Sequence, residues 1–65
     1  MNIADFRKLF LSLSFDKRYD IITNRDFLSA DLDIILFAFN LSDTRSKMYI
    51  INNDILCYKL IKSTL

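Results

Sequence analysis

The chain has 65 residues, a net charge of +1, one Cys and no His, Gly or Pro. A single Cys excludes an intramolecular disulfide, and the lack of His excludes the usual zinc sites of Cys and His. Without Gly the phosphate-binding loops cannot form, and without His the common base of serine and cysteine hydrolases is missing. We therefore expect no enzyme, no cofactor and no metal site, and we favour a binding or regulatory module.

The charge is too balanced for autonomous nucleic-acid binding, which requires a clustered basic surface. Apolar residues make up 52% of the sequence, and a chain this short cannot bury all of them. Some apolar surface should therefore remain exposed and meet a partner. The N-terminal residues lack the apolar segment of a signal peptide, and together with the free Cys this predicts a cytoplasmic protein.

The first predicted helix covers residues 3–13. Its apolar side chains recur at helical spacing and form one stripe: Ile3, Phe6, Leu9, Phe10 and Leu13. Leu11, Arg7 and Lys8 lie off this stripe. Leu11 is interpreted either as a tolerated exposed side chain or as a contact anchor flanked by Arg7.

The second predicted helix starts after Ser14, which can act as its N-cap. Phe15, Tyr19 and Ile22 then share one face. Asn24 is expected to end this helix in the left-handed conformation, in place of the missing Gly.

The third predicted helix is long and largely buried. Ser29 is its expected N-cap, and the apolar pattern continues to about Ile51. Apolar residues lie on two sides of it, so this helix should lie between neighbours or face the core on one side and a partner on the other.

Asp43 is the most distinctive residue of this predicted helix, because it continues an apolar stripe that includes Leu36 and Phe39. One interpretation is a half-exposed Asp, paired with Lys47 one turn later. The other is an anionic anchor inside an apolar interface, which requires a cationic group on a partner. Arg45 lies across the helix from Asp43 and is either a surface Arg or a second contact.

The end of the chain is ambiguous. Residues 52–54 predict a break, and residues 55–65 fit a short helix, an irregular packed tail or one strand of a hairpin. We favour the helix or the tail, since a hairpin would have no sheet to join. Cys57 is expected to be a small buried residue and Tyr58 to close the core. The predicted fold is all-α: a single domain over residues 1–65, built as a small bundle of three to four helices.

Several sequence blocks, taken in order, resemble the Hha/YmoA family of small bacterial regulators. The blocks are Ala4-Asp5-Phe6, Phe15-Asp16 followed by Ile21-Ile22 and Asn24, Phe27 followed by Leu28-Ser29, Asp43-Thr44-Arg45, and Tyr58-Lys59-Leu60-Ile61. Thr44 stands where the family has His, and Tyr58 where it has Trp. The resemblance implies a four-helix fold with one long central helix.

The resemblance also implies a function. Hha-like proteins bind the N-terminal dimerisation region of the nucleoid silencer H-NS or of its paralogues and strengthen gene silencing, including that of virulence genes. They do so without a DNA-reading element. Asp43 and Arg45 match the family's Asp and Arg, and Asp43 is expected to meet a basic group on the silencer. The other expected partner-binding residues are Arg7, Lys8, Leu11, Lys17, Arg18 and Arg25.

Other functional classes remain open at this stage. The apolar third helix would also suit a homodimer, and hence a small helical chaperone or a self-assembling protein. Contact with DNA is expected only indirectly or weakly, through phosphates and within the silencer complex.

Overall fold

The computed structural model describes residues 1–65 and contains helices but no strand. Five short α-helices are joined by tight connections, with one 3₁₀-helix between the second and third. The elements are α1 (Ile3–Leu11), α2 (Phe15–Thr23), η1 (Arg25–Ser29), α3 (Leu32–Asn40), α4 (Thr44–Asn52) and α5 (Asp54–Ser63). The all-α class is therefore confirmed, with more and shorter helices than predicted.

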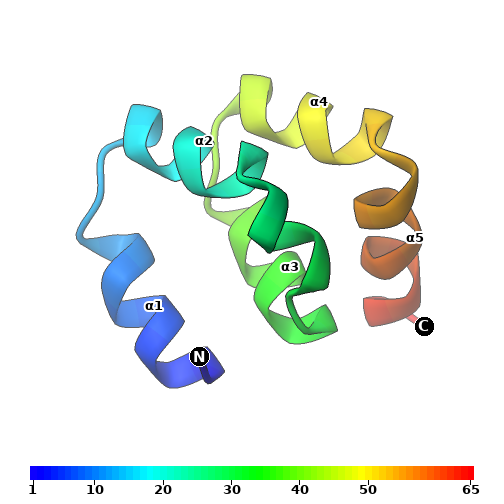
Figure 1. Cartoon of the computed structure of the whole chain (residues 1–65), viewed down its shortest axis with the longest axis horizontal. Helices are drawn as coiled ribbons and strands as arrows, with labels where there is room; N and C mark the ends of the chain where they lie inside the picture. Colours follow the sequence, from blue (N-terminus) through cyan, green and yellow to red (C-terminus); the bar gives the residue numbers. More distant parts are fainter.

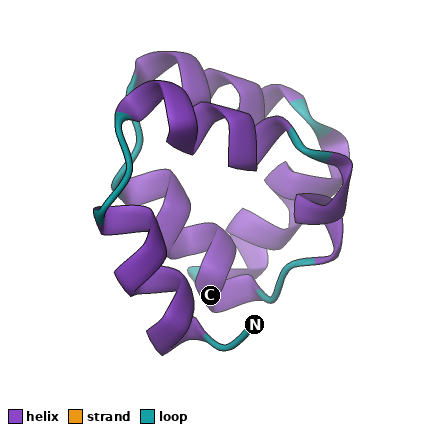
Figure 2. Cartoon of the chain, turned by 60° about the vertical axis from the view of Figure 1, so that its left-hand side comes forward, coloured by secondary structure: helices purple, strands orange, loops and turns teal.

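Helix α3 is the central element, with α1 on one side and α5 on the other (Figure 1). Helices α2 and α4 pack against each other at one end of the molecule, as Figure 2 also shows. The Cα atoms span 27 × 24 × 19 Å. No helix is both long and apolar enough to cross a lipid bilayer.

The long third helix was predicted wrongly. Two nine-residue helices, α3 and α4, take its place, and residues 41–43 form a turn between them. A straight helix over residues 29–51 would be about 34 Å long, which exceeds the 27 Å long axis of the molecule. The bend lets Ile35 and Ala38 of α3 share one core with Ile50 of α4, all fully buried.

Polar side chains near the turn explain where α3 ends. The Ser42 hydroxyl donates to the Phe39 carbonyl at 3.0 Å, and the Asp43 carboxylate accepts from the Ser46 N–H at 3.1 Å. Ser and Asp compete in this way for backbone groups that a continuous helix would use. Ser29 is not the N-cap of α3, because it ends η1 and Asp31 takes the N-cap position.

Side-chain caps start most of the other helices. The Ser14 cap of α2 is confirmed, since Ser14 Oγ accepts from the Lys17 N–H at 3.3 Å. Asn2 caps α1 and Asn53 caps α5 in the same way. Asn24 does not adopt the left-handed conformation: it has φ −70° and ψ 138° and caps η1. No residue of the chain has a positive φ, so every helix ends without the left-handed residue that Gly usually supplies.

An aromatic cluster forms the α1 side of the core. The Phe6 and Phe10 rings are stacked with centroids 5.0 Å apart, and Phe37 meets both rings edge-on at 6.2 Å. Such pairs add about 0.5–1.5 kcal/mol each beyond the burial of their area. The predicted stripe of α1 is thus buried at Phe6 and Phe10, whereas Leu9 is 41% exposed.

The C-terminal segment is helical, so the hairpin alternative is excluded. Helix α5 turns Leu56 and Leu60 toward the core, and Cys57 is half-buried. Tyr58 does not close the core: 59% of it is exposed. It lies on the opposite side of α5 from Leu56, because two residues along a helix correspond to a rotation of about 200°.

Candidate partner-binding site

Asp43 lies in the turn between α3 and α4 and not on the face of a long helix. It is the N-cap of α4, and its Oδ1 accepts from the Ser46 N–H at 3.1 Å. The predicted pairing with Lys47 is absent, since Lys47 Nζ lies over the Phe39 ring, 5.7 Å from its centroid. The half-buried Asp43 side chain therefore has a structural task, the start of α4, which is compatible with a further contact through its second oxygen.

The pKa of Asp43 is lowered from its ordinary value of 3.8. The largest cause is the hydrogen bond from the Ser46 backbone N–H, and the positive charge of Arg45 acts weakly in the same direction. Partial desolvation opposes both. A donor that binds the ionised form stabilises it, so this carboxylate is negatively charged throughout the neutral range.

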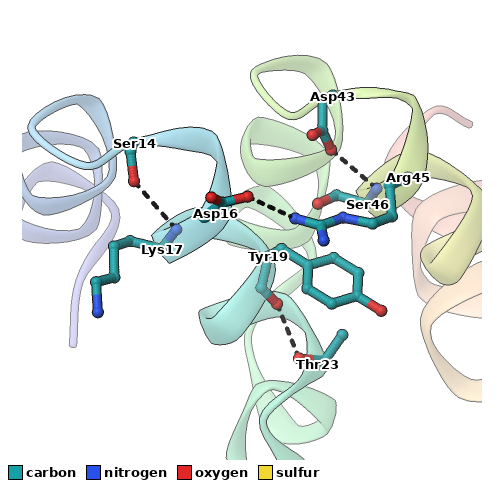
Figure 3. A network of polar contacts seen from close by, with 8 residues as sticks. All are labelled: Ser14, Asp16, Lys17, Tyr19, Thr23, Asp43, Arg45 and Ser46. Carbon is teal, nitrogen blue, oxygen red and sulfur yellow. Dashed lines mark hydrogen bonds and ion pairs between the residues drawn. The ribbon is translucent and has the colours of Figure 1, made fainter.

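Arg45 links α4 to α2 (Figure 3). One guanidinium nitrogen donates to Asp16 Oδ1 at 3.1 Å, the only ion pair in the structure. The guanidinium also lies over the Tyr19 ring, 3.8 Å from its centroid, and Tyr19 meets Tyr49 edge-on at 6.3 Å. About half of the Arg45 side chain (51%) is still exposed, so it is anchored at one end and available at the surface.

Arg18 has a different role from the one expected, because its donors are used inside the molecule. Nε donates to the Phe10 carbonyl at 2.9 Å, and the terminal nitrogens donate to the Leu41 carbonyl at 2.6 Å and the Leu11 carbonyl at 3.5 Å. These carbonyls lie at the C-terminal ends of α1 and α3, where a cation is favourable. Arg18 therefore joins the ends of two helices.

The other predicted partner-binding residues are exposed and come from three elements. Arg7, Lys8 and Leu11 lie on α1, Lys17 on α2 and Arg25 on η1. Leu11 is 56% exposed and stands three and four residues after Lys8 and Arg7, so the three side chains form one strip along α1. Arg7 also lies over the Phe37 ring, 5.4 Å from its centroid.

Two features of the structure have no signal in the sequence pattern. Asp16 and Tyr19 contact Arg45 from a helix 26 or more residues away, which local spacing cannot reveal. Lys59 is likewise a structural cation, since its Nζ donates to the Leu28 carbonyl at 2.7 Å and to the Ala30 carbonyl at 3.2 Å. No cluster of three or more metal-ligating side chains is present.

An open groove of about 520 Å³ lies between α1, η1 and the start of α3. Phe6, Leu9 and Phe27 are among the apolar residues that line it, while Asp26 and Asp31 also contribute to the lining. No local sequence pattern predicts this groove, because it forms only where residues of α1, α2, η1 and α3 come together.

Comparison with known proteins gives no match: no family model, no curated protein and no solved structure matches the chain. The likeness to the Hha/YmoA family therefore stays a prediction from the sequence blocks.

Proposed function

We propose that this chain acts by binding another protein, and that the partner is the N-terminal dimerisation region of an H-NS-type silencer. In this proposal the chain is a transcriptional co-regulator that modulates gene silencing and has no DNA-reading element of its own. Binding takes place at the surface formed by Asp43, Arg45 and the neighbouring α2, with the strip of Arg7, Lys8 and Leu11 on α1 as a second contact.

The observation that carries the proposal is the state of Asp43. Its pKa is lowered from 3.8, it stands beside a half-exposed Arg, and its Oδ1 accepts from the Ser46 N–H at 3.1 Å, so the carboxylate is held in one place at the start of α4. Arg45 stacks on Tyr19, and Arg and Tyr are enriched among residues that dominate binding at protein interfaces. A cationic group of a partner would complete this arrangement.

The identity of the partner depends on the sequence blocks and not on the fold. The long central helix that the resemblance implies is divided into α3 and α4. The Asp43-Thr44-Arg45 block nevertheless starts α4 at the surface. Recognition of the silencer must therefore come from the side chains of this block and of its neighbours.

An NMR titration of the labelled chain with the N-terminal dimerisation domain of H-NS tests the proposal. We expect shifts around Asp43, Arg45 and α1. The variant Asp43→Asn should lose binding and keep its helical content, since Asn is as good an N-cap as Asp but carries no charge. Asp31→Asn is the matched control, because Asp31 is an exposed N-cap residue at the start of α3, outside the proposed surface, and should bind like the wild type.

Two results would contradict the proposal. An absence of chemical-shift changes at several hundred micromolar silencer domain would exclude an H-NS-type silencer as the partner. Equal binding by the Asp43→Asn variant would remove Asp43 from the binding surface, even if the partner is right.

A further inference from the structure

Helix α5 presents an outward face that no other element covers. It lies along one side of the molecule, next to α3 and α4 (Figure 1). Its inward face is formed by Leu56, fully buried, and Leu60. Three large side chains point the other way and are exposed by more than half: Ile55 (51%), Tyr58 (59%) and Ile61 (55%).

The residues of this face are arranged symmetrically about Tyr58. Ile55 precedes it by three residues and Ile61 follows it by three; Asp54 precedes it by four and Lys62 follows it by four. All five lie on one side of the helix, since steps of three and four residues return to the same face. Asp54 and Lys62 are exposed, and Lys62 Nζ lies 5.6 Å from the centroid of the Tyr58 ring.

We infer that this face binds a second copy of the chain, with the two α5 helices antiparallel and a two-fold axis at Tyr58. In that arrangement the two Tyr58 rings meet at the centre. Each Ile55 lies level with the Ile61 of the other copy, and each Asp54 lies level with the other copy's Lys62. The contact is self-complementary, as a two-fold interface requires.

Charge decides the direction of the pairing. A parallel arrangement would place Asp54 level with Asp54 and Lys62 level with Lys62, which is repulsive at both ends. The antiparallel arrangement brings opposite charges together at both ends of an apolar centre. The remaining cation of α5, Lys59, does not disturb this pattern, because it is bound to the carbonyls of Leu28 and Ala30.

The inference goes beyond the proposed function, because it concerns a different face. Asp43 and Arg45 belong to the turn and the first residues of α4, whereas the dimer contact uses only α5. Dimerisation would supply two copies of the Asp43 surface in one particle, which suits a partner region that is itself a dimer.

Sedimentation equilibrium of the full chain from micromolar to millimolar concentration measures the self-association. We expect a reversible monomer–dimer equilibrium. Tyr58→Asp places two like charges at the centre of the contact and should raise the dissociation constant by about tenfold or more, because central aromatic side chains dominate such interfaces. The control is Leu9→Asp on α1, on the opposite side of α3, which should leave the equilibrium unchanged; circular dichroism verifies the fold of each variant.

Charge exchange tests the antiparallel direction. Asp54→Lys and Lys62→Asp should each weaken the dimer, because each creates like-charge pairs at both ends. The double variant should restore it, since the opposite pairs re-form with their signs exchanged. In a parallel dimer each residue would face its own copy, so neither single variant would change the like-charge character of any pair. Single variants that associate as well as the wild type, or a double variant that stays as weak as the single ones, would therefore overturn the antiparallel arrangement.

Other outcomes would overturn the inference and reassign the face. A wild-type chain that stays monomeric to millimolar concentration excludes a dimer. If the same monomer shows α5 shifts when the silencer domain is added, the face belongs to the heterologous partner. The Asp43→Asn variant should dimerise normally, so failure of the proposed function and failure of this inference give different results.

Discussion

Arg18 and Arg45 are both cations that the sequence suggests for partner binding, yet the structure uses them differently. Arg18 directs its nitrogens to three backbone carbonyls at the ends of α1 and α3. Arg45 forms one surface ion pair with Asp16, whose side chain is 91% exposed, and stacks on Tyr19. The acceptor of each cation therefore decides what the cation does. Arg18 donates to carbonyls at helix ends and supports the fold, whereas Arg45 is half-exposed and remains available to a partner.

The largest predicted effect is the loss of Arg18. Arg18→Met keeps an unbranched apolar side chain but removes the donor to the Leu41 carbonyl and one of the donors to the Phe10 carbonyl, which still accepts from the Leu13 N–H at 3.2 Å. It should lower the free energy of unfolding by about 2 kcal/mol. Urea denaturation followed by circular dichroism measures this. Lys17→Met removes the same charge from the neighbouring exposed position and should change stability by less than about 0.5 kcal/mol. Equal urea midpoints for the two variants would show that Arg18 is only a surface cation.

Lys59 extends the comparison to a second cation bound to carbonyls. Lys59→Met removes the donor to Leu28 and Ala30, and should lower the free energy of unfolding by about 1 kcal/mol, since one ammonium with two acceptors does less than a guanidinium with three. Lys8→Met, an exposed position on α1, is the control. A loss no larger than that of the control would contradict the role assigned to Lys59.

Asp43 adds a pH-dependent effect that is smaller still. Its folded-state pKa lies below the ordinary 3.8, so the ionised carboxylate contributes stability at higher pH and this contribution is lost as the pH falls through the folded-state pKa. The variant Asp43→Asn keeps a cap that does not titrate. The urea midpoint of the wild type should therefore exceed that of the variant near neutral pH, and the difference should shrink below pH 3.8. A difference independent of pH would mean that the charge of Asp43 adds nothing to its cap.

The smallest predicted effect is the coupling between Arg45 and Asp16. A double-mutant cycle with Arg45→Ala and Asp16→Asn should give a coupling free energy of about 0.5 kcal/mol or less, because both side chains are largely exposed. Added salt should reduce it further. A coupling free energy as large as the loss of stability in Arg18→Met would mean that Arg45 supports the fold as strongly as Arg18 does.

Much of the fold follows from local signals in the sequence. The burial of Phe6 and Phe10 on α1, the Ser14 cap and the break at residues 52–54 depend on residues close together in the chain, and each is found in the structure. Helix α1 ends at Leu11, two residues earlier than predicted. The division of the third helix was missed because the apolar pattern continues across residues 41–43. Only the tertiary requirement that Ile35 and Ile50 share one core shows that the helix must bend there.

The candidate site was less accessible to sequence reasoning than the fold. Local spacing predicts that Leu11 lies away from the core stripe of α1, and Leu11 is indeed exposed. The acceptors of Arg18 include the Leu41 carbonyl, 23 residues away, and those of Lys59 lie about 30 residues away. Tyr58 was predicted to close the core because aromatic side chains are often buried. Its position two residues after Leu56 places it instead on the exposed side of α5.

The connections between the helices have a kinetic consequence. None is longer than three residues, so the entropy lost in closing each loop is small. Among consecutive helices, α3 packs against α4 and α4 against α5, so these pairs can form early. A helical domain of this kind is expected to fold within microseconds to milliseconds. The bonds of Arg18 and Lys59 join segments far apart in sequence and should form last, which makes their loss visible chiefly as faster unfolding and only slightly as slower folding.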